Sequence, residues 1–174
     1  ASGVDADPLA LADRVYVPRR RGSFQAELVA ATRSSARIPW QVDPTLSALA
    51  AEVAAGRPVL VLQNLGLPAA PRWHYAVVIG VEPAVVTLRS GRNPRLRMPS
   101  RAFLRSWNWA GRWGLVALRP GEWPAAPEPQ RWLRAMSDLE QVGQPAIAVD
   151  GLEAAAARWP GESLVWFALG NSRY

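Results

Sequence analysis

The chain has 174 residues, of which 49% are hydrophobic and 20% are charged. This composition is typical of a globular protein and excludes a fully disordered chain. No run approaches the roughly 18 uninterrupted apolar residues that a membrane-spanning helix needs. The sequence has no cysteine and a single histidine, which excludes a disulfide framework, a thiolate metal site and a thiol nucleophile within these residues.

The net charge of +6 is unevenly distributed along the chain. Residues 1–120 hold 16 Arg and 7 acidic residues, whereas residues 121–174 hold 4 Arg and 7 acidic residues. The sequence therefore divides into a basic part and an acidic part. Basicity alone is weak evidence for a nucleic-acid partner.

Short helices are predicted for the first part of the chain. Residues 5–15 favour an N-capped helix with a proline in its first turn, and Ser23 is expected to cap a second helix. Residues 38–42 predict a short extended segment. A third helix is expected to begin at Thr45 and to end at Gly56.

The periodicity then changes to that of strands. Apolar runs bounded by Gly, Pro or Asn predict strands at residues 58–64, 74–80, 84–88 and 113–118, and residues 96–98 are expected to pair with the third of these. A short helix is expected around Phe103–Trp107. Helices first and an antiparallel sheet afterwards define an α+β domain, which we place at residues 1–118.

A second region follows a proline-rich stretch. Residues 119–130 carry four of the sixteen prolines and predict a semi-rigid linker. Residues 131–174 predict helices only, and Trp132 and Trp166 stand 34 residues apart, which is the period of tetratricopeptide repeats. Ala148, Leu152 and Pro160 also match positions of that repeat. The alternative is two unrelated amphipathic helices. Because such repeats need about three units for stability, we expect further sequence after Tyr174.

His74 is the only imidazole and begins an apolar strand, directly after a loop at residues 66–73. A lone histidine in this position is more often a core residue than a catalyst. Gln63 and Asn64 end the preceding strand, where they face a possible cleft. For Asn64, a turn-forming role is the simpler interpretation.

The segments GRPVLVLQ at residues 56–63 and WHYAVVIG at residues 73–80 resemble the papain-like bacteriocin-processing cysteine peptidases, the double-glycine peptidase group and its stand-alone bacterial relatives. The resemblance implies a papain-like fold with His74 as general base. We treat Gln63 and Trp73 as candidate substrate contacts, a role that the family pattern does not define. The position of the acid that orients the imidazole falls at Ser90, where this chain has only a hydroxyl.

The same resemblance implies a Cys-Gly-Pro motif at the head of a helix and an oxyanion-hole Gln, both of which would precede Ala1. We therefore expect the peptidase-like domain to lack its nucleophile and to be inactive by itself. No cofactor is expected. A peptide or protein substrate and a protein partner bound by the repeat segment are the implied partners, and the bacterial envelope or periplasm is the implied location, with the cytoplasm as the alternative.

Two other functions remain open from the sequence. The missing cysteine and the hydroxyl at Ser90 also suit a non-catalytic peptide-binding or scaffolding module. Residues 83–121 contain no acid and eight arginines interleaved with Trp107, Trp109 and Trp113, a composition that also suits single-stranded nucleic acid. A hairpin with a solvated arginine face and buried tryptophans explains the same residues more simply.

Overall fold

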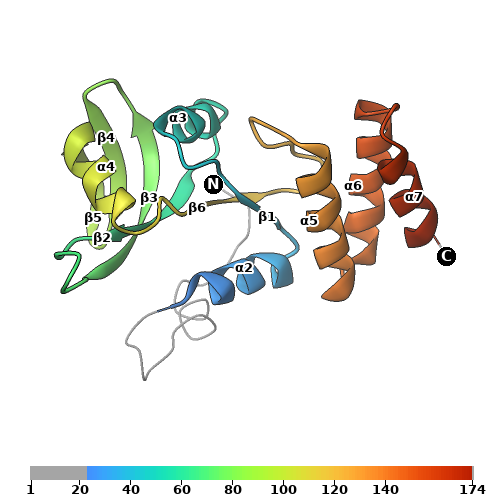
Figure 1. The fold of residues 1–174 in the computed structure, drawn as a ribbon, viewed down its shortest axis with the longest axis horizontal. Helices are drawn as coiled ribbons and strands as arrows, with labels where there is room; N and C mark the ends of the chain where they lie inside the picture. Colours follow the sequence, from blue (N-terminus) through green and yellow to red (C-terminus); the bar gives the residue numbers. More distant parts are fainter. Residues whose placement is uncertain (1–22, 174) are drawn as a thin grey trace. The chain divides into compact units, whose positions relative to one another are not determined.

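The computed structural model describes residues 23–173, which form a mixed α+β structure (Figure 1). Its helices are α2 (Gln25–Ser34), α3 (Leu46–Ala54), α4 (Ser100–Asn108), α5 (Pro129–Gln141), α6 (Pro145–Arg158) and α7 (Ser163–Ser172). Its strands are β1 (Ile38–Gln41), β2 (Val59–Asn64), β3 (Trp73–Val81), β4 (Val85–Ser90), β5 (Asn93–Pro99) and β6 (Gly114–Leu118). The α+β class predicted from the sequence is confirmed. None of the helices from residue 23 onward is long and apolar enough to cross a membrane.

The described residues group into two compact units. The sheet unit consists of Trp40–Val116 together with Pro124–Ala126. The helical unit consists of residues 23–39, Ala117–Trp123 and residues 127–173, so that α2 groups with the C-terminal helices. The domain boundaries expected from the sequence, 1–118 and 131–174 around a linker, stay a prediction.

The strands form one six-stranded sheet in the order β1-β6-β2-β3-β4-β5. The pairs from β6 to β5 are antiparallel. Leu96 of β5 pairs with Leu88 of β4, which confirms that residues 96–98 join the third predicted strand. β5 forms one edge of the sheet, and β3 and β4 lie inside it.

Helices α3 and α4 pack on the strands of the sheet unit (Figure 1). α3 begins as the sequence predicts, because the Thr45 hydroxyl accepts a hydrogen bond from the Ala48 amide at 3.1 Å and caps the helix. Val59, Val61 and Gln63 share one face of β2, since side chains alternate along a strand. Both valines are fully buried, so this face of the sheet carries the core.

Two helices are expected before residue 38, one at residues 5–15 and one capped by Ser23. Ser23 does not cap α2: the helix begins at Gln25, its N-cap is the extended residue Phe24, and no side chain caps it. A phenylalanine side chain has no oxygen to accept from the first amides, so α2 begins without a side-chain cap. The helix expected at residues 5–15 lies outside the described residues.

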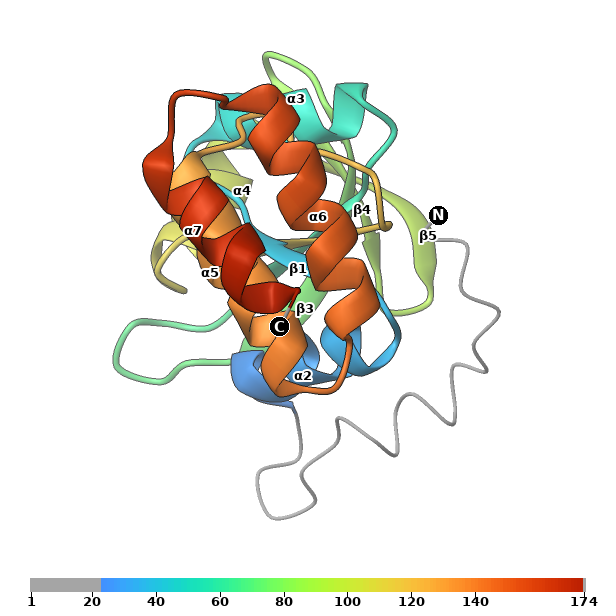
Figure 2. The ribbon, with the colours of Figure 1, turned by 90° about the vertical axis from the view of Figure 1, so that its right-hand side faces the viewer.

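The helical unit contains α5, α6 and α7, which lie side by side (Figure 2). Trp132 of α5 is 2% exposed, and its indole N–H donates to the Gly151 carbonyl of α6 at 2.9 Å. Ala148 and Leu152 of α6 are buried as well. An ion pair between Arg33 and Asp138 connects α2 with α5.

The proline-rich stretch is held by side-chain contacts on either side of Pro124. In the helical unit, Trp123 stacks on Trp132 with ring centroids 4.1 Å apart and meets Trp159 edge-on, and the Arg158 guanidinium lies over it. In the sheet unit, the Ala125 amide donates to the buried carboxylate of Glu52 at 2.7 Å. These residues are therefore ordered by specific contacts and do not form a free spacer.

Candidate functional site

The imidazole of His74 lies beside the hydroxyl of Ser90. His74 is the second residue of β3, Ser90 is the last residue of the neighbouring strand β4, and Nε2 of the ring is 2.7 Å from Oγ of the serine. Within residues 23–173, this is the hydrogen bond that the imidazole makes, which leaves Nδ1 available for a second group. The structure thus brings together the two residues that the sequence assigned to the base and to its orienting partner.

Ser90 can fix the ring but differs from an acid in its electrostatics. A hydroxyl donates or accepts, so it is compatible with either tautomer of a neutral imidazole. It carries no negative charge, and therefore it stabilises an imidazolium far less than a carboxylate does. Both side chains are half-buried, so solvent reaches the pair.

Gln63 lies directly opposite His74 in the pairing of β2 with β3. Its side chain is 1% exposed, and its amide donates to Ser106 Oγ of α4 at 2.7 Å. Ser106 in turn donates to the Phe103 carbonyl at 2.9 Å. The amide of Gln63 therefore ties α4 to the sheet next to His74. Gln63 is buried and its amide is already bonded, and its expected role as a substrate contact stays a prediction.

The loop between β2 and β3 presents apolar side chains next to His74. Leu65, Leu67 and Trp73 are each about half exposed or more, with Trp73 at 58%. Trp73 therefore has the exposure that the expected substrate contact requires. Three large apolar side chains in water, two on this loop and one at the start of β3, are a candidate surface for a peptide.

Asn64 holds this loop in shape. Its Oδ1 accepts from the backbone amides of Gly66 and Arg72, both at 2.9 Å, and its Nδ2 donates to the Leu67 carbonyl at 3.3 Å. A Cβ on Gly66 would stand 2.4 Å from the Ala70 carbonyl oxygen, so only glycine fits there. The turn-forming role predicted for Asn64 is confirmed.

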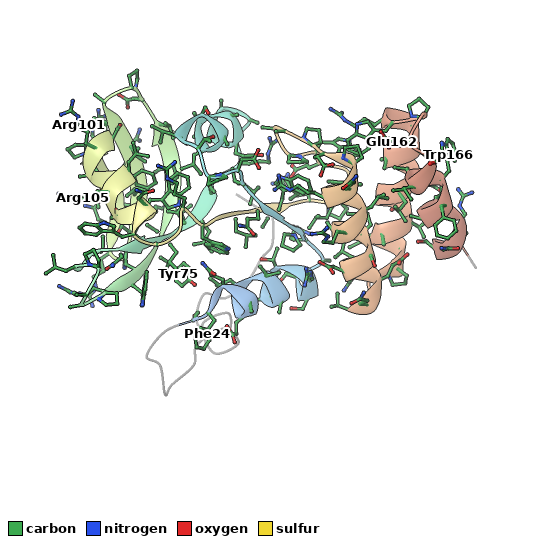
Figure 3. All side chains as sticks on the ribbon, viewed as in Figure 1. Phe24, Tyr75, Arg101, Arg105, Glu162 and Trp166 are labelled. Carbon is green, nitrogen blue, oxygen red and sulfur yellow. The ribbon has the colours of Figure 1, made fainter. Side chains whose placement is uncertain are left out.

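The tryptophans of the arginine-rich segment divide between core and surface. Trp107 is fully buried and Trp113 is 8% exposed, and the indole N–H of Trp107 donates to the Trp113 carbonyl at 2.8 Å. Trp109 is partly exposed, but the Arg105 guanidinium already lies over its ring at 5.7 Å from the centroid. Arg101 and Arg105 project from α4 into solvent (Figure 3). Of the two interpretations of this segment, a solvated arginine face over buried tryptophans is simpler than a nucleic-acid surface.

Ser106 is the site residue that the sequence analysis missed. It lies 43 residues from Gln63 in the chain, on a helix whose pairing with β2 no local pattern reveals. The available signal was Gln63 itself, because an amide in a buried apolar strand needs a hydrogen-bond partner. Among the described residues, no group of three or more His, Asp or Glu side chains is placed to hold a metal ion.

Comparison with protein-family models, with curated proteins and with solved structures found no match for this chain.

Proposed function

We propose that the sheet unit is the histidine-bearing part of a papain-like cysteine peptidase site that acts on peptides or protein leaders. The observation that carries the proposal is the 2.7 Å contact between His74 Nε2 and Ser90 Oγ on adjacent strands. A base held through one ring nitrogen, with the other nitrogen available, is the arrangement that a nucleophile–base–orienter triad requires.

In this proposal, each residue has a defined task. Ser90 accepts a hydrogen bond from Nε2–H of His74, which keeps Nδ1 free of a proton. Nδ1 can then take the proton of a thiol. The thiolate forms a bond to the peptide carbonyl carbon, and the imidazolium gives that proton to the amine that leaves as the C–N bond breaks. The 174 residues contain no cysteine, so the thiol comes from polypeptide outside them. Trp73 and the two leucines of its loop contact the peptide.

The helical unit supplies a protein-binding surface in the same proposal. Trp132 and Trp166 repeat after 34 residues, and the pair α5–α6 buries Trp132, Ala148 and Leu152 between its helices. This agrees with one tetratricopeptide unit formed by α5 and α6 and the first helix of another formed by α7. Such units recruit peptides or proteins by a concave helical surface.

The decisive experiment uses a longer polypeptide that includes the translated coding sequence upstream of Ala1. If a cysteine is encoded there, a thiol-directed active-site probe should label it, and His74→Ala should abolish labelling without unfolding the protein. Ser90→Ala should slow labelling, by about ten- to a hundredfold if it orients the base. Ser163→Ala, an exposed serine on α7, is the matched control and should have no effect. Labelling that survives His74→Ala overturns the proposal.

A non-catalytic peptide-binding module is the second candidate, and two observations favour it. The partner of His74 is a hydroxyl, which weakens general-base catalysis, and the exposed Leu65, Leu67 and Trp73 form an apolar surface that needs no chemistry to bind a peptide. Selection of a displayed random peptide library on the 174-residue chain tests it. Affinity of a selected peptide that is lost in Trp73→Ala but kept in His74→Ala supports a binding module.

A further inference from the structure

The sheet unit has an open pocket on the face that His74 does not use. Side chains alternate across a strand, so Tyr75 and Val77 of β3 point away from the face of His74. Arg89 of β4 pairs with Val77 and therefore shares the face of Val77. The pocket has a volume of about 470 Å³ and is lined by Tyr75, Val77, Arg89, Arg92, Asn93 and Pro94, among others.

The position of Arg89 is not explained by protection of a sheet edge. Arginines on an edge strand discourage pairing with other chains, and this accounts for Arg95 and Arg97 on β5. Arg89 is on β4, which has a neighbouring strand on both sides. At such a position inside a sheet, a β-branched or aromatic side chain would pack better against its neighbours than an exposed arginine does.

No acidic residue neutralises the pocket. Within Trp40–Val116 the acids are Asp43, Glu52 and Glu82, and none of them lines it. Glu52 pairs with Arg57, and Glu82 pairs with Arg97. Arg89 and Arg92 therefore line the same pocket, and neither has a carboxylate partner among the described residues.

The turn that brings Arg92 to the pocket is sharply defined. Gly91 takes the left-handed conformation with φ at 55°, and Ser90 pairs with Asn93 across the turn. Asn93 Oδ1 accepts from the Arg95 amide at 2.9 Å, so its NH₂ group remains a donor. The pocket is thus lined by two arginines and a neutral amide donor together with the apolar side chains of Val77 and Pro94 and the ring of Tyr75. Tyr75 extends from β3 in Figure 3.

We propose that this pocket binds an oxyanion, a carboxylate or a phosphate, that is carried on an apolar body. Guanidinium forks bind both groups through two parallel N–H···O bonds, which makes arginine the natural residue for such a site. The apolar residues of the lining offer no favourable contact to a fully hydrated small ion, so we expect such an ion to bind weakly. The site is independent of the proposed peptidase function, because it lies on the other face of the sheet from His74.

The test is a titration of the 174-residue chain followed by the ¹H–¹⁵N spectrum of its backbone amides. The probes are 3-phenylpropionate, phenyl phosphate, neutral 3-phenylpropanamide and inorganic phosphate. We expect the two aromatic anions to shift amides of residues 89–93 and the neutral amide to shift none of them. The relative affinities of 3-phenylpropionate and phenyl phosphate distinguish a carboxylate site from a phosphate site, and binding of inorganic phosphate alone contradicts the apolar part of the proposal.

Matched variants locate the binding. Arg92→Ala in the exposed turn should weaken binding by about tenfold or more, the loss expected for a charge-assisted hydrogen bond. Arg89→Ala should do the same. Arg105→Ala on α4 removes the same charge from the same unit and should change affinity by less than about twofold, since exposed charges act weakly at a distance. Equal weakening in Arg105→Ala, or unchanged binding in Arg92→Ala, overturns the proposal, and His74→Ala should leave binding unaffected.

Discussion

A single buried side chain, Asn64, shapes the apolar loop beside His74. Its Oδ1 satisfies the backbone amides of Gly66 and Arg72, and its Nδ2 gives the Leu67 carbonyl a second donor beside the Ala70 amide. We expect Asn64→Ala to lower the free energy of unfolding by about 2–3 kcal/mol, because buried polar groups that lose their partners pay the full desolvation cost. Urea unfolding measures this change.

The control for this prediction is Asn93→Ala. Asn93 is exposed and accepts one bond from the Arg95 amide, so water replaces its side chain and the loss should stay below about 1 kcal/mol. Equal losses in the two variants would show that the Asn64 bonds do not determine the stability of the loop. A further readout is cleavage at residues 65–72 by a protease at low concentration, which should accelerate only in Asn64→Ala.

Substitution of Glu52, a buried charged residue, should also lower the free energy of unfolding. Its side chain is almost inaccessible, and its two oxygens accept from Arg57 Nε and from the Ala125 amide. Glu52→Gln keeps the volume but leaves the partly buried Arg57 without a counter-charge, which should cost about 2–4 kcal/mol. Thermal or urea unfolding gives the value.

Glu82→Gln is the matched control, because Glu82 forms an ion pair with Arg97 in which both side chains are more than half exposed. Exposed pairs contribute little, so this variant should change stability by less than about 0.5 kcal/mol. A loss in Glu82→Gln as large as that in Glu52→Gln would mean that burial does not set the strength of the Glu52 contacts.

At the scale of the element, two glycines in helices should respond to alanine with opposite signs. Alanine favours a helix by about 1 kcal/mol over glycine. A Cβ on Gly170 of α7 would have no atom within 4 Å, so Gly170→Ala should stabilise the protein by about 0.5–1 kcal/mol. A Cβ on Gly151 of α6 would stand 2.2 Å from the sulfur of Met136, which is fully buried.

Gly151→Ala must therefore displace Met136 from a packed interface between α5 and α6. Overpacking of this kind costs about 1–3 kcal/mol and outweighs the gain in helix propensity. Melting temperatures of the two variants, measured side by side, test the pair. A higher melting temperature for Gly151→Ala would show that the methionine moves aside freely and that the α5–α6 contact is loosely packed.

Over the whole molecule, the sequence predicted what local patterns determine. The strands at residues 58–64, 74–80 and 84–88 and the Thr45 cap depend on neighbours in the chain, and each is present. The contact of His74 with Ser90 followed as well, because a hairpin connects β3 to β4.

Other features depend on contacts between distant residues, and these could not be predicted. Gln63 meets Ser106 only after the helix α4 has packed on the sheet, so the strand pattern indicates that the Gln63 amide needs a partner but not which residue supplies it. The shared pocket of Arg89 and Arg92 depends on strand alternation combined with the turn at Gly91. In the arginine-rich segment, composition could not separate a core tryptophan such as Trp107 from an exposed one.

The surface of the helical unit carries the last prediction. Leu164, Trp166 and Phe167 of α7 are all more than half exposed, and Trp166 projects from the helix in Figure 3. Adjacent apolar side chains in water bind hydrophobic dyes and promote association.

Phe167→Ser combined with Leu164→Ser should therefore lower the binding of anilinonaphthalene sulfonate by at least about twofold and raise solubility, with no loss of stability. Asn171→Ser, an exposed polar change on the same helix, should leave both unchanged. If dye binding is the same in the double variant and in the parent chain, the apolar surface that binds the dye lies elsewhere, and the exposed side chains of the loop at residues 65–73 become the next to vary.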